Sequence, residues 1–574
     1  MVVKGRVVQV RGDYIRVSFD DEDLKYVGRR GQFLRIKTDS GRDLIAIVAS
    51  LELSDELYRQ ARSLSMFPEH YDELILRRND ILVTVVGTLT GDGKIERKYD
   101  AIPSPGNIVE LMGASELNKI FSRDDQNHIR IGTLANDPKV RVSLDLNQLA
   151  TKHVAILAMT GAGKSNTLAT LIVRILKGLP AARILLIDTH SEYIGLSAIN
   201  RVSRGKVTIY CPVGKYRDII EQELEMKDAL KNLEIPYWFL NIDEWFSLLG
   251  LGTQASTQRR ILRMALRDIK GAYLDVPRYF DIEELIQRIG RSGARRDSID
   301  SLLDKLEDAR YSAEYEFIFN PCECLSVKDN PKAVFRKVIE PIISPGLKII
   351  ALGGVPSDVQ TAVVSMLLRS LFRVTVEAKL KGRVIPTIVA VEEAHVYAPR
   401  DTYAPSKSII ERIAKEGRKF GTGLIIVSQR PKDLSSTVLA QCGTLIALRL
   451  VNPSDQRYIM ESIEDITWYL TRSLAGLGVG EALISGFSVP IPCIAKIDLF
   501  RHVAKEEFGI DIELGGRDIN VSEEWSQELS EEDLDEIIDQ LYEGYGKLLK
   551  ETDSEKRDKG LKITEFFTGD PSSE

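Results

Sequence analysis

Short runs of alternating hydrophobic and polar residues fill the first hundred positions of the chain. They are separated by turns that contain glycine and aspartate, at residues 11–13 and 39–41. Alternation with a period of two is typical of half-buried β-strands, and strands at this spacing predict a small β-barrel over residues 1–106. One helical stretch, at about residues 55–65, interrupts the strands. The strand-like runs are residues 7–10, 14–19, 33–36, 44–48 and 81–86.

From residue 154 onward the pattern changes to short runs that are wholly apolar. Amphipathic helical patterns separate most of these runs. Continuous apolar strands that alternate with helices are typical of a parallel sheet covered by helices on both faces. We therefore predict an α/β domain over residues 148–500, preceded by a bridging segment at residues 107–147. The apolar runs are residues 154–159, 184–187, 349–352, 388–391, 424–427 and 445–448.

Two further segments interrupt or extend the α/β pattern. Between about residues 215 and 340 the apolar positions follow helical spacing, as over residues 261–269, and this predicts a helical insertion. Residues 501–574 are rich in acidic side chains and contain one amphipathic helical pattern at about residues 534–545. We expect them to form an acidic C-terminal extension.

Charge is distributed unevenly along the 574 residues. The whole chain carries a formal net charge of −7, but residues 501–574 alone hold 9 basic and 22 acidic side chains. Residues 1–500 therefore carry a net charge of +6. A basic body permits contact with nucleic acid, although the acidic extension hides this in the charge of the whole chain.

Several function classes are disfavoured by composition. Five scattered cysteines do not make a disulfide framework. The pair Cys322 and Cys324 has no second pair of ligands nearby, which a zinc site needs. No run approaches the ~18 consecutive apolar residues of a membrane span, and the first residues are charged rather than signal-like. We expect a cytoplasmic protein.

A phosphate-binding loop is predicted where an apolar strand meets a helix. The segment 161–165, with the sequence GAGKS, follows the run at residues 154–159 and opens a helical pattern. Glycines let backbone N–H groups point at phosphate oxygens, Lys164 reaches the β- and γ-phosphates of ATP, and Ser165 coordinates Mg²⁺. Ala158 replaces the first glycine of the usual motif, and its small side chain suits that position. The predicted nucleotide-binding residues are Thr160, Gly161, Ala162, Gly163, Lys164, Ser165 and Asn166.

Two adjacent acids end the apolar run at residues 388–391. In this arrangement the first acid, Glu392, holds Mg²⁺ through water, and the second, Glu393, orients and deprotonates the attacking water. Aspartate is more usual at the first position, so Glu392 is a departure from the common pattern. The pair predicts that ATP is hydrolysed and not only bound.

A rival acid and a polar sensor follow two other predicted strands. Asp188 ends the run at residues 184–187 and could assist the water or the metal, while His190 and Tyr193 could hold the loop in place. Gln429 follows another apolar run and could contact the water beside the γ-phosphate. Both Asp188 and Gln429 therefore belong to the predicted catalytic set.

A basic residue at a predicted helix end is a candidate arginine finger. The segment 411–421, with the sequence ERIAKEGRKFG, runs as a helix into a glycine break and contains Arg418 near its end. An arginine at this place could reach the γ-phosphate on a neighbouring subunit and stabilise the charge of the transition state. A surface salt bridge is the alternative interpretation of a single arginine.

In their order along the chain these motifs resemble the HerA family of hexameric DNA translocases, within the HerA–FtsK branch of P-loop ATPases. The resemblance covers about residues 1–500 and implies a RecA-like ATPase core with a parallel sheet, a small barrel before it, and ATP with Mg²⁺ as cofactors. The similar segments are KHVAI at 152–156, TGAGKS at 160–165, DTHSEY at 188–193, VEEAH at 391–395, EGRKFG at 416–421 and SQRP at 428–431.

The same resemblance implies partners. Proteins of this family form a homo-hexameric ring with DNA in its centre, and in archaea they work with a NurA-type nuclease in DNA end resection. In this chain residues 396–407 directly follow the acid pair, and Arg400 and Lys407 are candidates for phosphate contact. No base-reading motif is evident, so we expect binding that is independent of DNA sequence.

Two other functions fit the same residues. One is a motor of the conjugation and secretion class, which moves protein or DNA at a membrane. The other is an assembly scaffold that binds ATP without motor work, although the acids Glu392 and Glu393 favour hydrolysis. ATPase activity that DNA stimulates would favour the translocase, and stimulation by protein partners alone would favour the others.

Overall fold

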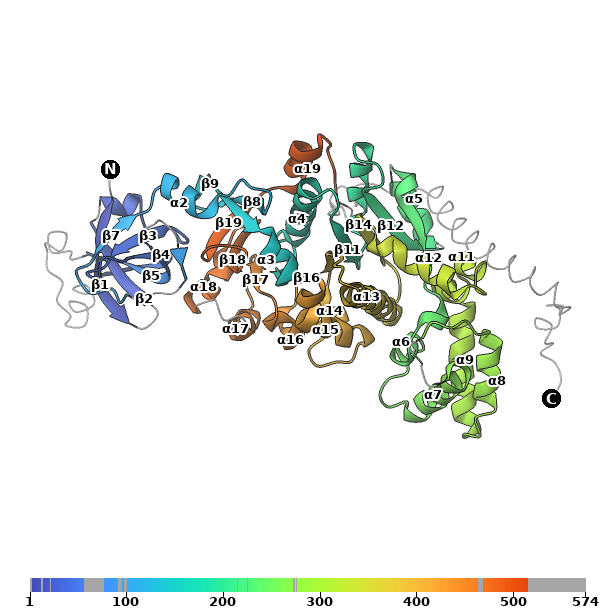
Figure 1. Ribbon diagram of the computed structural model, residues 1–574. Helices are drawn as coiled ribbons and strands as arrows, with labels where there is room; N and C mark the ends of the chain where they lie inside the picture. The colour runs from blue at the N-terminus through green and yellow to red at the C-terminus, as the bar shows by residue number, and fades with distance from the viewer. Residues whose placement is uncertain are drawn as a thin grey trace, which may run out of the picture.

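The computed structural model describes residues 3–11, 14–20, 22–55, 77–90, 95–97, 101–213, 215–224, 226–271, 274, 276–462 and 468–514. A β-barrel lies at one end, a wide sheet with helices on both faces lies in the middle, and a group of helices lies at the other end (Figure 1). This arrangement confirms the predicted α/β class with an N-terminal barrel and a mostly parallel sheet.

The barrel is a closed ring of six strands in the order β2-β1-β7-β3-β4-β5, in which β5 pairs back with β2. Alternate residues such as Leu34, Ile36 and Leu44 are buried in its core, as the period-two pattern predicts. The helix predicted at about residues 55–65 lies outside the described residues, apart from Asp55, which ends β4. The strands are β1 (Lys4–Arg11), β2 (Tyr14–Phe19), β3 (Phe33–Lys37), β4 (Asp43–Asp55), β5 (Arg77–Leu89), β7 (Ile108–Leu111) and, paired to β5 outside the ring, β6 (Ile95–Glu96).

The second sheet has twelve strands in the order β13-β12-β14-β11-β15-β16-β10-β17-β18-β19-β8-β9. The strands from β13 to β17 are parallel, and those from β17 to β9 are antiparallel. The central parallel strands are buried on both faces, which explains their wholly apolar sequences. The strands are β8 (His128–Leu134), β9 (Asp137–Asp145), β10 (Val154–Leu157), β11 (Arg183–Asp188), β12 (Val207–Pro212), β13 (Leu230–Leu233), β14 (Gly346–Ala351), β15 (Thr387–Val391), β16 (Thr422–Ser428), β17 (Thr444–Ala447), β18 (Glu481–Gly486) and β19 (Cys493–Ile497).

Residues 107–147, which the sequence predicts to bridge two domains, contribute to both sheets instead. They supply β7 to the barrel, then helix α2 (Ala114–Phe121), and then β8 and β9 at the antiparallel edge of the large sheet. At Gly132 in β8 a Cβ atom would come within 2.0 Å of the Lys496 carbonyl oxygen. Glycine therefore allows β8 to approach β19 closely enough to join the sheet.

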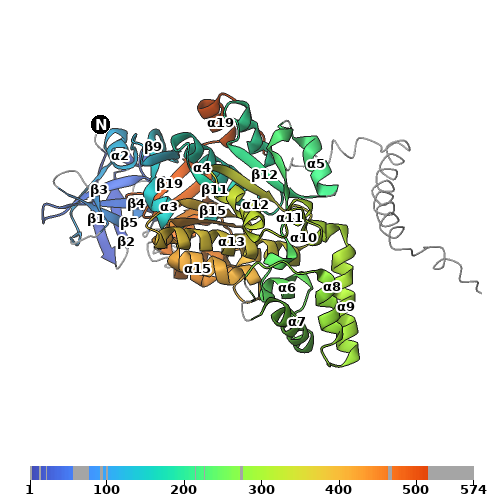
Figure 2. The same ribbon diagram turned by 45° about the vertical axis from the view of Figure 1, so that its right-hand side comes forward.

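Helices cover both faces of the parallel strands. In Figures 1 and 2, α4 (Lys164–Gly178) and α19 (Phe500–Phe508) lie on one face, and α13 (Ser357–Leu380) and α15 (Pro405–Phe420) lie on the other. Helix α13 is long and apolar enough to cross a membrane by length and composition, but 78% of its apolar window is buried inside the protein. It is therefore a core helix. Residues beyond 514, including the predicted acidic helix, lie outside the described residues.

The predicted insertion begins with helix α5 (Lys215–Glu223) and the edge strand β13 and continues as further helices. The side chains of Tyr237, Trp238, Trp245 and Phe319 form its aromatic centre. The fully buried carboxylate of Glu244 joins it to α13 through an ion pair with Arg369, with 2.9 Å between Oε2 and Nη2. Its further helices are α6 (Ile242–Leu248), α7 (Ser256–Lys270), α8 (Ile282–Gly290), α9 (Arg296–Tyr311), α10 (Glu316–Phe319), α11 (Cys322–Leu325) and α12 (Pro331–Ile343).

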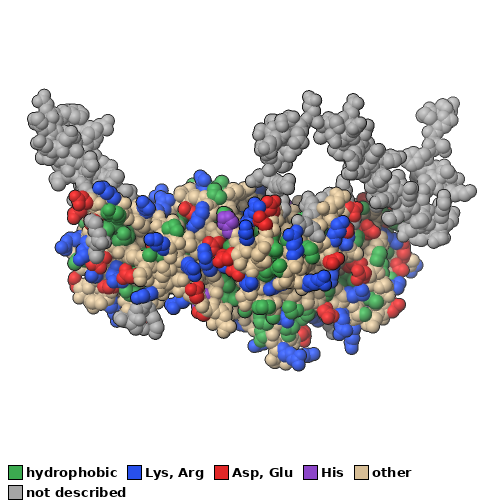
Figure 3. All heavy atoms as spheres, turned by 90° about the horizontal axis from the view of Figure 1, so that it is seen from above, with side chains coloured by type: hydrophobic (Ala, Val, Ile, Leu, Met, Phe, Trp, Pro, Cys, Tyr) green, Lys and Arg blue, Asp and Glu red, His purple; other side chains and the backbone are tan. Residues whose placement is uncertain are grey.

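Charges of both signs are mixed on the face of the molecule seen in Figure 3. Blue lysine and arginine side chains are scattered among red acidic ones over this face and do not gather in one patch. Phosphate binding draws on clustered Lys and Arg contacts. The visible face therefore lacks the concentrated positive charge of a DNA-binding surface.

Candidate active site

The residues predicted to act on ATP gather at one edge of the large sheet. This edge holds the carboxyl ends of the parallel strands, where ligands bind in open α/β sheets. The phosphate-binding loop follows β10, Asp188 ends β11, Glu392 and Glu393 follow β15, and Gln429 follows β16. The sheet order β11-β15-β16-β10 places these strand ends side by side.

The loop between β10 and α4 has the backbone that its glycines permit. Gly161 and Gly163 have φ angles of 75° and 105°, in the left-handed region that favours glycine. Gly163 is also the N-cap of α4. Ala158 is buried and donates its N–H to the Ser428 carbonyl at 3.2 Å. Because Ala158 has no positive φ angle, the usual glycine is not required there.

Lys164 contacts the acid pair directly. Its Nζ forms an ion pair and hydrogen bond with the Glu393 carboxylate and lies 3.7 Å from Oε1 of Glu392. The lysine side chain is 14% exposed, and the two acids are almost completely buried. Lys164, the predicted phosphate ligand, and Glu393, the predicted base, are therefore paired with each other in this structure.

The two acids differ in their surroundings. Both carboxylate oxygens of Glu392 are buried and accept no hydrogen bond from the residues that the structure describes. Burial, with the nearby charge of Asp188, raises the pKa of Glu392. Glu393 has a φ angle of 46°, in the left-handed region, and is the N-cap of the short helix α14 (Ala394–Tyr397). Such strain in a non-glycine residue is typical of functional sites held in place by their surroundings.

Asp188 organises a loop. Its two carboxylate oxygens accept the backbone N–H groups of Glu192, at 3.0 Å, and Tyr193, at 2.9 Å. The side chain is fully buried, and burial raises its pKa. The acid after β11 that reaches the phosphate-binding loop is instead Glu192, whose Oε2 accepts the Ser165 hydroxyl at 2.8 Å. Glu192 lies in the DTHSEY motif, but its place in the sequence does not indicate this contact.

Two further predicted binding residues, Thr160 and Asn166, make different contacts. Thr160 donates its hydroxyl to Oε1 of Gln429 at 2.7 Å, so the loop and the predicted sensor are in contact. Asn166 is engaged elsewhere, because its side chain bonds the Asp498 carbonyl at 3.0 Å and the Phe500 N–H at 2.7 Å. Asn166 therefore fastens α4 to the β19–α19 connection.

The arrangement fits Mg²⁺ bound together with a nucleotide. The carboxylate of Glu392, which accepts no hydrogen bond from the described residues, and the hydroxyl of Ser165 are oxygen ligands of the kind that Mg²⁺ takes. Among the described residues no group of three His, Cys, Asp or Glu side chains could hold a metal alone. Mg²⁺ usually completes its shell with waters and substrate phosphates.

Arg418 lies at the opposite edge of the sheet from its own phosphate-binding loop. It is exposed in the last turn of α15, which ends just before β16 begins. Burial and the nearby charge of Arg418 lower the pKa of Lys152, which precedes β10. Strand β10 has four residues and rises ~3.3 Å per residue. The phosphate-binding loop at its carboxyl end therefore lies about 13 Å from the edge that holds Arg418.

His153 helps to hold α15 at that edge. Its Nε2 lies 3.0 Å from the Ala414 carbonyl oxygen, and its Nδ1 accepts the Leu424 N–H at 3.0 Å. Burial lowers the pKa of His153 to about 4, so the ring is neutral near pH 7. This buried contact fixes the end of the helix that carries Arg418.

Of the two candidate DNA contacts, Arg400 lies in the loop between α14 and α15, and Lys407 lies in the first turn of α15. Arg400 is exposed, and its guanidinium carbon lies 4.9 Å from the centre of the Tyr458 ring. Lys407 donates from Nζ to the Arg400 carbonyl at 2.8 Å. Lys407 therefore braces the loop, and Arg400 is the more accessible of the two.

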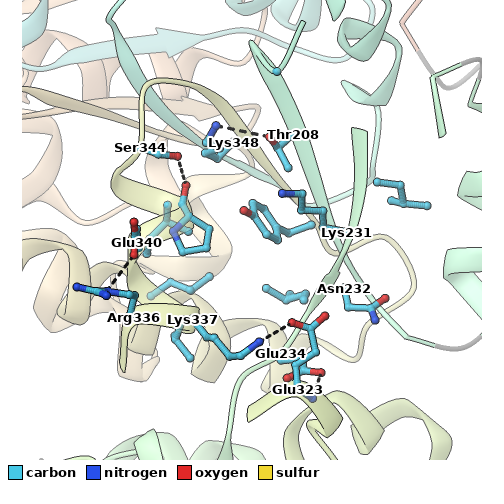
Figure 4. Close-up of a pocket in the computed structure, with 18 of the residues that line it drawn as sticks. Thr208, Lys231, Asn232, Glu234, Glu323, Arg336, Lys337, Glu340, Ser344 and Lys348 are labelled. Atoms are coloured by element: carbon cyan, nitrogen blue, oxygen red, sulfur yellow. Dashed lines mark hydrogen bonds and ion pairs between the residues drawn. The ribbon is translucent and has the colours of Figure 1, made fainter. Parts of the chain in front are cut away.

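A cleft of about 1490 Å³ lies away from this site (Figure 4). Its lining includes Thr208, Lys231 and Lys348, at or near the amino ends of β12, β13 and β14. Lys348 is buried, and desolvation with the charge of Lys231 lowers its pKa to about 8. The cleft is at the amino ends of parallel strands, whereas the phosphate-binding loop is at their carboxyl ends.

Comparison with known families and proteins found matches over most of the chain. The family model described as the central domain of helicase HerA matches residues 129–371, and that described as the HerA-like C-terminal region matches residues 359–494. The DNA double-strand break repair helicase HerA of Sulfolobus acidocaldarius is 33% identical over 77% of this chain and 80% of its own length. The protein of the same name from Pyrococcus furiosus is 27% identical over 87% of this chain and 92% of its own length.

Solved structures with a similar arrangement are more distant. VirB4 of Thermoanaerobacter pseudethanolicus aligns with a TM-score of 0.46 and 17% identity, over 65% of this chain and 97% of its own. The bacterial conjugative coupling protein TrwB aligns with a TM-score of 0.39 and 15% identity, over 68% of this chain and 92% of its own.

Proposed function

This chain belongs to the HerA helicase family, and we propose on that premise that it is an ATP-driven DNA translocase that works as a homo-hexameric ring. The observation that carries the proposal is the meeting of Lys164, Ser165, Glu392 and Glu393 at the carboxyl ends of adjacent strands. This set contains a phosphate ligand, two oxygen ligands for a metal and a base for water. It is what hydrolysis of a nucleoside triphosphate requires.

Binding of ATP would rearrange the pair that Lys164 and Glu393 form. Lys164 moves to the β- and γ-phosphates, where its charge has a stronger partner. That movement frees one carboxylate oxygen of Glu393 to accept a proton from water. The water oxygen then bonds to the γ-phosphorus, the bond to the bridging β–γ oxygen breaks, and ADP and phosphate are formed.

The other side chains at this edge would support that step. Ser165 and Glu392 would hold Mg²⁺, which supplies charge stabilisation to the phosphates when bound. Glu192 already accepts a hydrogen bond from Ser165, so it would orient the hydroxyl or a metal-bound water. Gln429 would report the state of the γ-phosphate to the loop through Thr160.

DNA would be bound through its backbone and without sequence preference. The loop that carries Arg400 follows the strand of the acid pair, so movement at the γ-phosphate can reach it through α14. The relatives are named as DNA double-strand break repair helicases. We extend the proposal to DNA end resection together with a NurA-type nuclease, in the cytoplasm.

ATPase activity that depends on DNA tests this proposal. We expect the wild-type protein with Mg²⁺ to hydrolyse ATP severalfold faster when linear duplex DNA is added, in a colorimetric phosphate assay. Lys164→Ala should abolish both the basal and the stimulated rates, because the phosphates lose their main cationic partner. Hydrolysis that responds only to protein partners would favour a secretion-type motor, and nucleotide binding without hydrolysis would favour a scaffold.

A further inference from the structure

A histidine that contacts the acid pair has no role in the mechanism so far. His395 lies in α14, two residues after Glu393, and its side chain is 15% exposed. We propose that His395 is a positioning residue, which holds the carboxylate of Glu393 in place while Lys164 is occupied with phosphate. The inference rests on the proposed hydrolysis of ATP at this site.

The contact is made to the carboxylate oxygen that Lys164 does not use. Nδ1 of His395 lies 3.3 Å from Oε2 of Glu393, while Nζ of Lys164 bonds Oε1. Oε2 is buried and accepts no hydrogen bond from the described residues, so its 3.3 Å contact with His395 is an ion-pair distance in this state. A buried carboxylate oxygen without a donor is costly, so a proton on Nδ1 is favoured at this place.

A second contact joins His395 to the next strand. Its Nδ1 lies 3.2 Å from the hydroxyl oxygen of Ser428, the last residue of β16. The same hydroxyl accepts the backbone N–H of Arg430 at 3.1 Å. Gln429 lies between these two residues and accepts a hydrogen bond from Thr160. His395 therefore connects the base to the strand end that carries the predicted sensor.

The pKa of the His395 ring is lowered, which favours its neutral form. Burial lowers the pKa of its ring, and the charges of Arg430 and Lys164 act in the same direction. The charges of Glu393 and Asp433 oppose them. The contact with Glu393 therefore depends on the place of one N–H group rather than on a positive charge.

The consequence appears when ATP binds. Once Lys164 leaves for the phosphates, Glu393 loses the partner of Oε1, and within the described part of the chain the contact with His395 is what continues to restrain the carboxylate. With Oε2 held, Oε1 keeps the orientation in which it can take a proton from water. A base that is misplaced by about 1 Å can lose on the order of a hundredfold in rate.

Two substitutions separate the position of the N–H group from the bulk of the ring. An asparagine amide can occupy the place of Nδ1, and a longer glutamine amide reaches the place of Nε2 instead. We expect His395→Gln and His395→Ala to lower the basal kcat by about tenfold to a hundredfold, with the KM for ATP unchanged within about twofold. His395→Asn should retain kcat within a few-fold of the wild type. His502→Ala, at an exposed position of α19, is the control for a histidine substitution.

A double substitution of His395 and Glu393 gives a second readout, because it measures whether the two side chains act on the same step. In a Glu393→Gln background His395→Ala should cause little further loss, since both changes act on the same proton transfer. Equal kcat for the Asn and Gln variants, or a full additional loss in the double variant, would overturn the proposal. Basal hydrolysis is measured without DNA, so the effect of the His395 substitutions can be measured whether or not DNA stimulates the enzyme. An enzyme that hydrolyses ATP but does not respond to DNA would refute the translocase proposal alone. Thermal midpoints confirm that each variant is folded.

Discussion

Glu393→Gln is expected to keep ATP bound and to lower kcat by about a hundredfold to ten-thousandfold, the range of a lost general base. Glutamine has the shape of glutamate but cannot accept the proton of the attacking water at neutral pH. The substitution also removes the charge that holds Lys164 in the absence of nucleotide. We therefore expect an affinity for ATP equal to or higher than that of the wild type.

Single-turnover hydrolysis and binding of a fluorescent ATP analogue, measured on the same preparation, check both parts of this result. Glu377→Gln, at an exposed position of α13, is the matched control and should hydrolyse ATP at the wild-type rate. A Glu393→Gln protein with near-normal turnover would refute the assignment of the base. In that case Glu192, which contacts Ser165, becomes the acid to substitute next.

Arg418→Ala is expected to reduce hydrolysis on the order of a thousandfold, as the loss of an arginine finger does in some P-loop enzymes. The loss should act across a subunit boundary, because Arg418 is at the opposite edge of the sheet from its own phosphate-binding loop. We therefore expect the exposed guanidinium to act on a nucleotide bound to another copy of the chain. Lys419→Ala, the adjacent exposed position, is the control and should retain activity.

Mixed assemblies distinguish action across the boundary from action within one chain. Arg418→Ala and Glu393→Gln subunits are each inactive alone, but in a mixed ring some interfaces join an intact Arg418 to an intact Glu393. Hydrolysis should therefore return on mixing, once exchange of labelled subunits has been verified. If verified exchange restores no activity, and cross-linking places Arg418 beside Lys164 of its own chain, the assignment is refuted.

The strand ends that form the candidate site could be located from the sequence because its motifs are local. The strand, glycine loop and helix around Lys164 are continuous in sequence, and the acids Glu392 and Glu393 directly follow an apolar strand. Burial on both faces of the sheet removes polar residues from such strands, so their ends are visible in the pattern. The same property made the parallel core predictable.

Features that depend on strand order could not be predicted in the same way. Glu192 reaches Ser165 although two strands, β15 and β16, lie between β11 and β10 in the sheet. Strands β8 and β9 mix buried residues with partly buried or exposed ones at an antiparallel edge, which resembles the pattern of the barrel strands before them. The engagement of Asn166 with residues 498 and 500 likewise depends on a contact between distant parts of the chain.

Displacement of a third strand from a DNA triplex tests the central claim most directly, because a protein that moves along duplex DNA strips off a strand in its path. The account predicts that the wild-type ring displaces the labelled strand with ATP and Mg²⁺, and that neither Glu393→Gln nor a non-hydrolysable ATP analogue supports displacement. An active ATPase that binds the same DNA yet leaves the third strand in place, with or without a nuclease partner, would contradict the claim that this chain is a DNA translocase.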